Sequence, residues 1–259
     1  MTSPILELEG YSLERNGRTV LRDVTFTVAR GERVAVLGPN GAGKSTLLQC
    51  LTRILGGGRG RARIDGRPLE SYGQRELARR TAYVPQAEGR PAPFTVREFV
   101  EMARYAHLGP MAPVRSEDRR AVERALADAE VTSLAERPLD MLSGGERQKA
   151  WLAAALAQEA DLLLLDEPTA FLDPPRQADI LRMLARVHAE RGTTMLFVTH
   201  DLNQAAAHAS RAIALREGAI VFDGPVDGLL RVDVLRSVYA HEFVMGAHPR
   251  TGRVVVLPE

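Results

Sequence analysis

A short glycine-rich segment carries the residues of this sequence that are best suited to chemistry. GPNGAGKST, residues 38–46, comes directly after the apolar run Val34–Leu37. It fits the spacing G-x-x-x-x-G-K-[ST], in which successive backbone N–H groups wrap around a phosphate chain. Gly41 and Gly43 allow the positive φ and the close approach that such a loop needs. The pattern predicts a nucleotide-phosphate site made of Pro39, Asn40, Gly41, Ala42, Gly43, Lys44, Ser45 and Thr46.

The residues after this loop are expected to form a helix. Ser45, Leu47, Leu48 and Leu51 have helical spacing, so the loop opens onto a helix N-terminus. The dipole and the first amides of a helix favour phosphate at that end. Lys44 is therefore expected to reach the β- and γ-phosphates, and Ser45 to coordinate Mg²⁺.

Two carboxylates follow a second apolar run. Leu162–Leu165 reads as a fully buried strand, and Asp166 and Glu167 come directly after it. Open α/β sheets place their ligands at the carboxyl ends of the strands. Asp166 is expected to hold Mg²⁺ through its water shell, and Glu167 to polarise the attacking water. A strand that simply ends in solvated acids is the plainer alternative.

Two further polar residues follow predicted strands. His200 ends the segment MLFVTH, where a contact to the γ-phosphate is favoured over a purely structural histidine. Gln86 follows Tyr83-Val84, and it could meet both the metal and the water or be an ordinary surface glutamine. Hydrolysis needs metal charge, an oriented water and stabilisation of the transferred group, so these residues would complete the chemistry.

A second anion-binding helix start is predicted at LSGGERQ, residues 142–148. Ser143 and Glu146 have the spacing of a capping box, and 148–158 is strongly helix-forming. Gly144 and Gly145 leave the first backbone amides uncovered by side chains. The chain thus has one phosphate loop but two helix starts suited to an anion.

These motifs together resemble the ATP-binding cassette (ABC) ATPases. GPNGAGKST, the glutamine after AYVP, LSGGERQ, LLLLDEP, the Leu172-Asp173 pair and VTHD occur in that family's order over nearly the whole chain. The resemblance implies an α/β fold: a P-loop NTPase core of the ABC-ATPase type, with an N-terminal antiparallel β region and an inserted α-helical subdomain. It implies an ATPase with ATP and Mg²⁺ as its cofactors.

The same resemblance implies a homodimer that shares its sites. In that family two cassettes associate head to tail, and the signature of one closes on the γ-phosphate held by the other. Carried over, Ser143, Gly144, Gly145 and Glu146 act in trans on ATP held by Lys44. Asp173 then lies on the loop that crosses the dimer.

The sequence departs from the family pattern at two places. Glu146-Arg147-Gln148 stands where the shortest form of the family's signature, LSGGQ, has a glutamine. The longer form resembles the signature of importers. The family usually stacks adenine on an aromatic side chain just before the second strand, but the alignment of NGRTVL puts Arg15 there. A guanidinium plane can stack on a base, and Tyr11, four residues earlier, remains the alternative.

The rest of the chain divides around these motifs. Alternation from Ile5 to Val28 predicts antiparallel strands with turns at Asn16-Gly17 and Gly31. The polar, proline-rich segment EGRPAPF after Gln86 is predicted to be a loop. A capping box at Thr95–Glu98 begins a helical section that runs to about Asp140, broken at 109–113. Strands and helices alternate again from Ala160, with a helix from about Arg176. We expect one domain, 1–259, with 1–89 and 160–259 as the core and 90–159 as the helical subdomain.

Composition excludes several classes of protein. The 259 residues are 45% hydrophobic, and 34 basic against 33 acidic residues leave a net charge of +1. That charge does not suit a dedicated nucleic-acid binder. The one cysteine, Cys50, reads as a small core residue of a chain in a reducing compartment. No signal peptide and no apolar run of about 18 residues are found, so we expect a cytoplasmic protein that reaches a membrane only through partners.

The variable segments favour one branch of the family. TVREFVEMARYAHLG, RQKAWLAAALAQ, HDLNQAA and the tail HPRTGRVVVLP most resemble ATPases that energise uptake of iron-siderophore, haem or cobalamin, with ferric siderophore favoured. This implies transmembrane permease subunits, an extracytoplasmic substrate-binding protein, and a peripheral place on the cytoplasmic face of the membrane. The groove near Gln86 to Tyr105 is expected to receive a permease helix. Alternatives are the ATPase of another ABC transporter and a soluble cassette protein acting on ribosomes or DNA.

Overall fold

The computed structural model describes residues 3–86, 93–108, 113–249 and 252–258. The chain forms two compact units, Met1–Leu69 with Met195–Glu259, and Glu70–Thr194. The predicted loop EGRPAPF and the predicted break at 109–113 fall largely outside the described residues. The division of the chain into 1–89, 90–159 and 160–259 stays a prediction.

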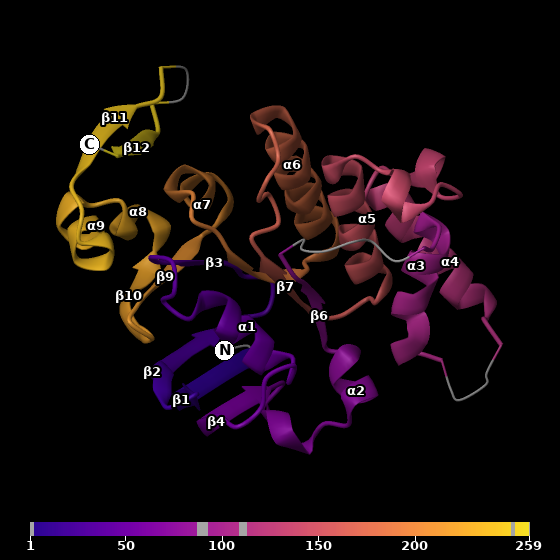
Figure 1. The fold of residues 1–259 in the computed structure, drawn as a ribbon, viewed down its shortest axis with the longest axis horizontal. Coiled ribbons are helices and arrows are strands. Elements are labelled where there is room, and N and C mark those ends of the chain that lie inside the picture. Colours follow the sequence, from indigo (N-terminus) through magenta and orange to yellow (C-terminus); the bar gives the residue numbers. More distant parts are fainter. Residues whose placement is uncertain (1–2, 87–92, 109–112, 250–251, 259) are drawn as a thin grey trace. The chain divides into compact units, whose positions relative to one another are not determined.

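The first unit is built mainly from strands. Its elements are β1 (Leu6–Arg15), β2 (Arg18–Val28), β3 (Arg33–Leu37), α1 (Lys44–Leu51), β4 (Arg59–Ile64), β5 (Arg67–Pro68), nearly all of β8 (Thr194–Val198), α7 (Leu202–His208), β9 (Arg211–Arg216), β10 (Ala219–Pro225), α8 (Val226–Leu229), α9 (Val232–Tyr239), β11 (Phe243–Ala247) and β12 (Val254–Pro258). One sheet has the order β2-β1-β4-β5, and β10-β9-β3-β8 are neighbours in another. β11 and β12 form a separate antiparallel pair, visible with α8 and α9 near the C-terminus in Figure 1.

The N-terminal antiparallel strands are confirmed. β1 pairs with β2 in the register Leu6↔Val28 to Arg15↔Arg18, and Asn16 and Gly17 form the turn with φ values of 49° and 72°. Such a turn needs positive φ at both central residues, which asparagine and glycine tolerate. β1 also pairs with β4, so the pair is part of a larger sheet.

The first unit also contains the strands that lead to the phosphate loop. β3 runs parallel to both β8 and β9, and Val34–Leu37 are fully buried. A parallel strand covered on both faces needs such an unbroken apolar run. Cys50 is 1% exposed on α1, which confirms it as a core residue, and burial raises the pKa of its thiol.

The second unit is mainly helical. Its elements are α2 (Gln74–Ala78), β6 (Thr81–Val84), α3 (Val96–Met102), α4 (Ser116–Asp128), α5 (Gly144–Ala157), β7 (Leu162–Asp166) and α6 (Pro174–Arg191), with short 3-10 helices at Ala103–Ala106, Thr132–Leu134 and Leu139–Met141. β6 and β7 are parallel. α3, α4 and α5 pack on one another, as Figure 1 shows. The predicted all-helical section after Thr95 is confirmed in the described residues.

The two predicted capping boxes are confirmed as well. The Thr95 hydroxyl accepts a hydrogen bond from the Glu98 N–H (3.2 Å), and the Glu98 carboxylate accepts one from the Thr95 N–H (2.8 Å). Ser143 and Glu146 make the same reciprocal pair at the start of α5. The helix predicted from about Arg176 begins two residues earlier, at Pro174.

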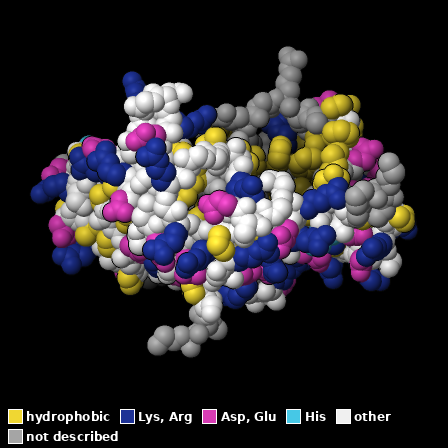
Figure 2. Space-filling view, turned by 90° about the horizontal axis from the view of Figure 1, so that it is seen from below, with side chains coloured by type: hydrophobic (Ala, Val, Ile, Leu, Met, Phe, Trp, Pro, Cys, Tyr) yellow, Lys and Arg dark blue, Asp and Glu magenta, His cyan; other side chains and the backbone are white. Residues whose placement is uncertain are grey.

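The charged side chains of the surface are mixed in sign. Lys and Arg are interspersed with Asp and Glu over the face shown in Figure 2. This agrees with a net charge of +1 and with the absence of a large single-sign field on that face. No helix in the described part of the chain is both long and apolar enough to cross a membrane.

Candidate functional site

The phosphate loop begins where β3 ends and closes where α1 begins. Gly38, Gly41 and Gly43 have φ values of 135°, 78° and 98°, so the loop uses the positive φ that was predicted for Gly41 and Gly43. Gly43 is the N-cap of α1, and it brings no side chain to the helix start. A Cβ on Gly43 would lie 2.8 Å from the carbonyl oxygen of Val20. Only glycine therefore fits at this helix start, where an anion is favoured.

Lys44 is held against the loop that precedes it. Its side chain is 6% exposed, and Nζ donates hydrogen bonds to the carbonyl oxygens of Gly38 (2.8 Å) and Pro39 (2.9 Å). A buried ammonium group must be hydrogen-bonded, and these carbonyls keep it at the loop. The geometry suits a positive charge that meets phosphate oxygens.

The first unit places His200 at the same sheet edge as the phosphate loop. β3 and β8 are parallel, with Val36 opposite Val198, so Gly38 and Thr199 leave the sheet at the same end. His200 follows and is exposed, and Asp201 caps α7 by accepting from the N–H groups of Asn203 (2.8 Å) and Gln204 (3.0 Å). Asp201 therefore fixes the turn that carries His200.

The structure separates the two candidates for adenine stacking. Tyr11 is 5% exposed and lies in the core, where a Cβ on Gly58 would collide with its ring. Arg15 is exposed at the end of β1. Arg15 therefore stays the predicted stacking residue.

The second unit brings together Asp166, Glu167 and Gln86. β6 and β7 pair in the register Val84↔Leu165, so both leave the sheet at one edge. The Gln86 amide Nε2 donates to Glu167 Oε2 (3.3 Å). The Tyr83 hydroxyl donates to Asp166 Oδ2 (3.2 Å), and Asp166 is 2% exposed. Tyr83 was not predicted as a site residue, because its contact with Asp166 depends on the pairing of β6 with β7.

Glu167 has a backbone conformation that is unusual for its residue type. Its φ is 47°, in the left-handed region that residues other than glycine rarely adopt. Glu130, Glu159 and Glu217 have similar φ values of 57°, 50° and 50°, so the angle alone does not mark a functional residue. It fixes the direction in which the chain leaves β7 at Glu167.

The signature segment forms the start of α5. Ser143 is the N-cap, its N–H donates to the Glu146 carboxylate (2.8 Å), and hydrogen bonds from the backbone and side chain of Ser143 lower the pKa of Glu146. Ser143, Gly145 and Glu146 border a cavity of about 340 Å³ together with the cations Lys149 and Arg176. Glu130 and Asp179 line the same cavity, and Lys149 is paired with Glu130 at 2.8 Å, so the cavity has no excess of positive charge. The uncovered amides at the start of α5 are the feature of this surface that suits an anion.

Asp173 lies next to this segment within the second unit. Its carboxylate accepts from the Arg176 N–H (3.0 Å) and caps α6, which explains why the helix begins at Pro174. A Cβ on Gly145 would lie 2.9 Å from Cδ of Arg176, and one on Gly144 would lie 4.0 Å from Leu172 Cδ2. The predicted signature and the Leu172-Asp173 pair therefore form one surface.

The predicted metal ligands suit Mg²⁺ by their chemistry. Ser45, Asp166 and Gln86 offer a hydroxyl, a carboxylate and an amide, and oxygen is the donor that Mg²⁺ prefers. Among the described residues no three His, Cys, Asp or Glu side chains converge on one point. A Mg²⁺ site built from one or two carboxylates and phosphate oxygens does not need such a cluster.

The predicted site residues divide between the two units. Residues 39–46, Arg15 and His200 belong to the first unit. Gln86, Asp166, Glu167, Asp173 and the signature residues 143–146 belong to the second. Each unit carries one helix start suited to an anion, at Lys44 and at Gly144. The pattern matches a phosphate-binding part and a water-activating part of a nucleotide hydrolase.

Comparison with known proteins agrees with these features. A family model described as ABC transporter matches residues 21–170. The chain is 39% identical over 260 residues to the ferric enterobactin transport ATP-binding protein FepC of Escherichia coli (strain K12), covering 100% of this chain and 96% of that protein. It is 43% identical over 249 residues to the hemin import ATP-binding protein HmuV of Streptomyces coelicolor, covering 96% and 88%.

Solved structures give the same assignment. A metal-chelate type ABC transporter in an inward-facing conformation matches with a TM-score of 0.86 and 28% identity, covering 99% of this chain and 98% of that chain. An ATP-binding cassette in a dimeric, post-hydrolysis state bound to ADP and phosphate matches with a TM-score of 0.74 and 28% identity, covering 85% and 98%. The chain belongs to the ABC transporter family and is one of its ATP-hydrolysing chains.

Proposed function

We propose that this chain is the ATPase subunit of an importer for an iron chelate, either a ferric siderophore or haem. The observation that carries the proposal is similarity along the full length of the chain, at 39% and 43% identity, to proteins named for ferric enterobactin transport and for hemin import. The chain itself has no described membrane-spanning helix, so transport requires permease subunits from other chains, and those subunits would hold it at the membrane.

The site residues receive roles in this proposal. Lys44 and the amides of residues 39–46 bind the phosphates, and Ser45, Asp166 and Gln86 hold Mg²⁺, which supplies positive charge to the β- and γ-phosphates when it is bound. Glu167 orients and polarises the attacking water, with Gln86 as its neighbour at 3.3 Å. His200 contacts the γ-phosphate, and Arg15 stacks on adenine.

A second copy of the chain completes each site in this proposal. Ser143, Gly144 and Gly145 of one copy approach ATP held by Lys44 of the other, and Asp173 lies at the boundary between the copies. The capped helix start, whose first two residues are Gly144 and Gly145, supports this role. The dimeric state of the related cassette with ADP and phosphate supports it too.

The permease is proposed to dock on the second unit near α3. Tyr105 and Met102 are 62% and 44% exposed, and the guanidinium of Arg75 lies 4.2 Å from the centre of the Tyr105 ring. The predicted groove from Gln86 to Tyr105 includes residues 87–92, which are outside the described part of the chain. Exposed aromatic and methionine side chains are typical of surfaces that pack against a partner helix.

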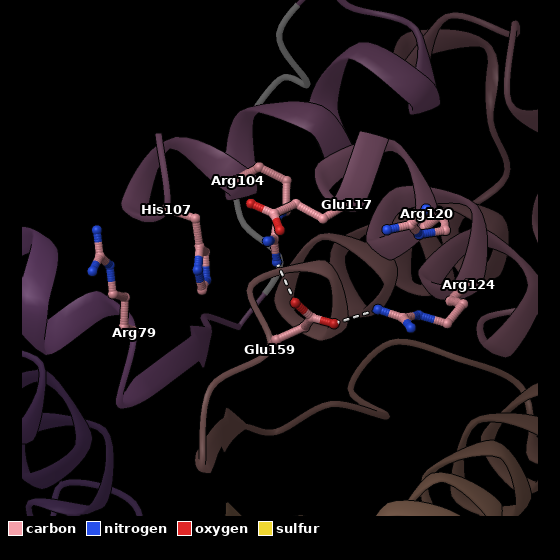
Figure 3. Close-up of a pocket in the computed structure, with 7 residues that line it drawn as sticks. All are labelled: Arg79, Arg104, His107, Glu117, Arg120, Arg124 and Glu159. Atoms are coloured by element: carbon pink, nitrogen blue, oxygen red, sulfur yellow. Dashed lines mark hydrogen bonds and ion pairs between the residues drawn. The ribbon is translucent and has the colours of Figure 1, made fainter. Parts of the chain in front are cut away.

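A basic cavity adjoins this surface. It measures about 430 Å³ and is lined by Arg79, Arg104, His107, Glu117, Arg120, Arg124 and Glu159. Figure 3 shows Glu159 between Arg104 and Arg124, with which it forms ion pairs of 2.7 and 2.6 Å. Arg104 also pairs with the buried carboxylate of Asp118 at 3.0 Å, so four arginines face three carboxylates and the excess of positive charge is small. We propose that this cavity takes an acidic side chain of the permease helix.

Charge reversal at the cavity tests the docking proposal. Arg120→Glu is expected to reduce recovery of the permease in a pull-down at least several-fold, because it repels an acidic partner group. Arg119→Glu, on the same helix but not lining the cavity, is the matched control and should retain the permease. ATP binding by the isolated chain should be unchanged in both variants. Equal recovery with both variants would rule out the cavity as the acidic docking point.

Transport in cells tests the proposed function directly. Deleting the gene should lower uptake of labelled ferric siderophore or haem at least tenfold, and the wild-type chain but not Glu167→Gln should restore it. Comparing siderophore, haem and cobalamin in the same strain identifies the substrate. Normal uptake of all three would point to another ABC transporter, and co-purification with ribosomes or DNA instead of a permease would point to a soluble cassette protein.

A further inference from the structure

The C-terminal helix α9 ends at Tyr239, whose hydroxyl lies near the backbone N–H of Gly38 within the first unit. α9 packs on β9, β10 and β11, with Leu235 and Val238 fully buried. The ring of Tyr239 meets the ring of Phe243 edge to face, with centroids 5.6 Å apart. This packing fixes the direction of the Tyr239 side chain, because an edge-to-face contact restricts how the ring can turn.

The hydroxyl of Tyr239 is unusual in this structure. Within residues 3–86, 93–108, 113–249 and 252–258, it is the one buried side-chain oxygen or nitrogen without a hydrogen-bond partner of proper geometry. The backbone N–H of Gly38 lies close enough to influence its pKa, although burial dominates and raises that pKa to about 12. The phenol is thus neutral near pH 7 and can accept a hydrogen bond from an N–H group. A buried hydroxyl without a partner costs stability, so it calls for an explanation.

Gly38 is the first residue of the phosphate loop after β3 ends at Leu37. A Cβ at Gly38 would collide with the carbonyl oxygen of Leu215 on β9. The Gly38 carbonyl accepts a hydrogen bond from Lys44 Nζ at 2.8 Å. Arg216, the next residue on β9, donates from Nη1 to the Ser237 carbonyl of α9 at 2.6 Å. Gly38 is therefore in contact with Lys44 and with the strand that holds α9.

We propose that Tyr239 is a positioning residue for the phosphate loop, and that its hydroxyl accepts a hydrogen bond from the Gly38 N–H when nucleotide phosphate occupies the loop. The N–H and the carbonyl of Gly38 belong to the two peptide groups on either side of its Cα, and the carbonyl accepts from Lys44 Nζ. A hydrogen bond from the N–H to Tyr239 restricts Gly38 and so supports the position of the carbonyl that holds the lysine ammonium. Nucleotide binding then gives the buried Tyr239 hydroxyl a hydrogen-bond partner, and α9 becomes part of the nucleotide site. This role depends on ATP binding alone and not on the transported substrate.

Tyr239→Phe is the test, because it removes the hydroxyl and keeps the ring contact with Phe243. Titration of the purified variant with ATP and ADP should show that Kd for each nucleotide is roughly threefold to tenfold higher than in the wild type. That is the effect of one lost hydrogen bond. KM for ATP should rise by a similar factor while kcat changes less than about twofold. The unfolding temperature without nucleotide should stay the same or rise, whereas the increase that ATP produces should shrink.

Matched variants separate positioning from packing. Tyr72→Phe removes a hydroxyl from a tyrosine of the second unit that is only 5% exposed, and it should leave nucleotide affinity unchanged. Gly38 amide exchange with ADP bound should be slow in the wild type and faster in Tyr239→Phe. An unchanged Kd in Tyr239→Phe would overturn the inference. So would an unfolding temperature of Tyr239→Phe that is lower than that of the wild type by the same amount with and without nucleotide. A wild-type chain that binds ATP but supports no import would leave this inference intact and overturn only the proposed function.

Discussion

Glu167→Gln is expected to stop ATP turnover while ATP binding persists. An amide cannot take a proton from water, and loss of a general base lowers a rate by about 10²- to 10⁴-fold. Phosphate release should therefore fall at least about 100-fold, whereas the Kd for ATP should stay within a few-fold of the wild type. Because the trapped ATP would still bridge two copies, gel filtration with Mg-ATP should show a dimer that the wild type does not accumulate.

The surroundings of Glu167 make this variant informative. Glutamine has the same shape, so it can remain beside Gln86 and keep the backbone conformation with φ of 47°. Glu190→Gln, an exposed position on α6, removes the same charge away from the site and should hydrolyse ATP normally. Hydrolysis at normal speed by Glu167→Gln would refute its assignment as the base.

The parts of the site that the sequence predicted are those encoded locally. A phosphate loop needs glycines and a lysine at fixed spacing, and Val34–Leu37 marks the strand before it. Apolar runs ending in polar residues likewise placed Asp166 and His200 at strand ends. Capping boxes are four-residue patterns, so the starts of α3 and α5 were predicted correctly. α6 was predicted as well, but with its start two residues late, although Asp173-Pro174 is a recognisable N-cap and N1 signal.

The features that were not predicted from the sequence depend on tertiary contacts. Arg104 and Asp118 are 4% and 1% exposed and pair inside the helical unit, yet each reads as a surface charge in the sequence. The positive φ of Glu167 has no residue-level signal, because glycine or asparagine would be expected there. Tyr239 is 201 residues after Gly38 in the chain, and no local pattern links them.

The matched pair Ser143→Ala and Thr95→Ala tests whether the signature acts on ATP or only caps a helix. Both residues are N-caps in complete capping boxes of the second unit, so each variant should lose about 1 kcal/mol of unfolding free energy. Only Ser143→Ala should lose hydrolysis, by about 100-fold, because loss of a donor to a developing negative charge has that effect. Equal hydrolysis by the two variants would reduce the signature to a structural cap.

Mixing two inactive variants then decides whether the signature acts in trans. A pair made from one Lys44→Ala chain and one Ser143→Ala chain has one site in which both defects meet and one site with neither. Random pairing gives half mixed pairs, so hydrolysis should recover to roughly a quarter of the wild-type rate. Hydrolysis by the wild type should also rise more than linearly with protein concentration when dilute. Mixed pairs that are shown to form but remain inactive, or a rate strictly proportional to concentration down to the monomer, would mean that each chain completes its own site.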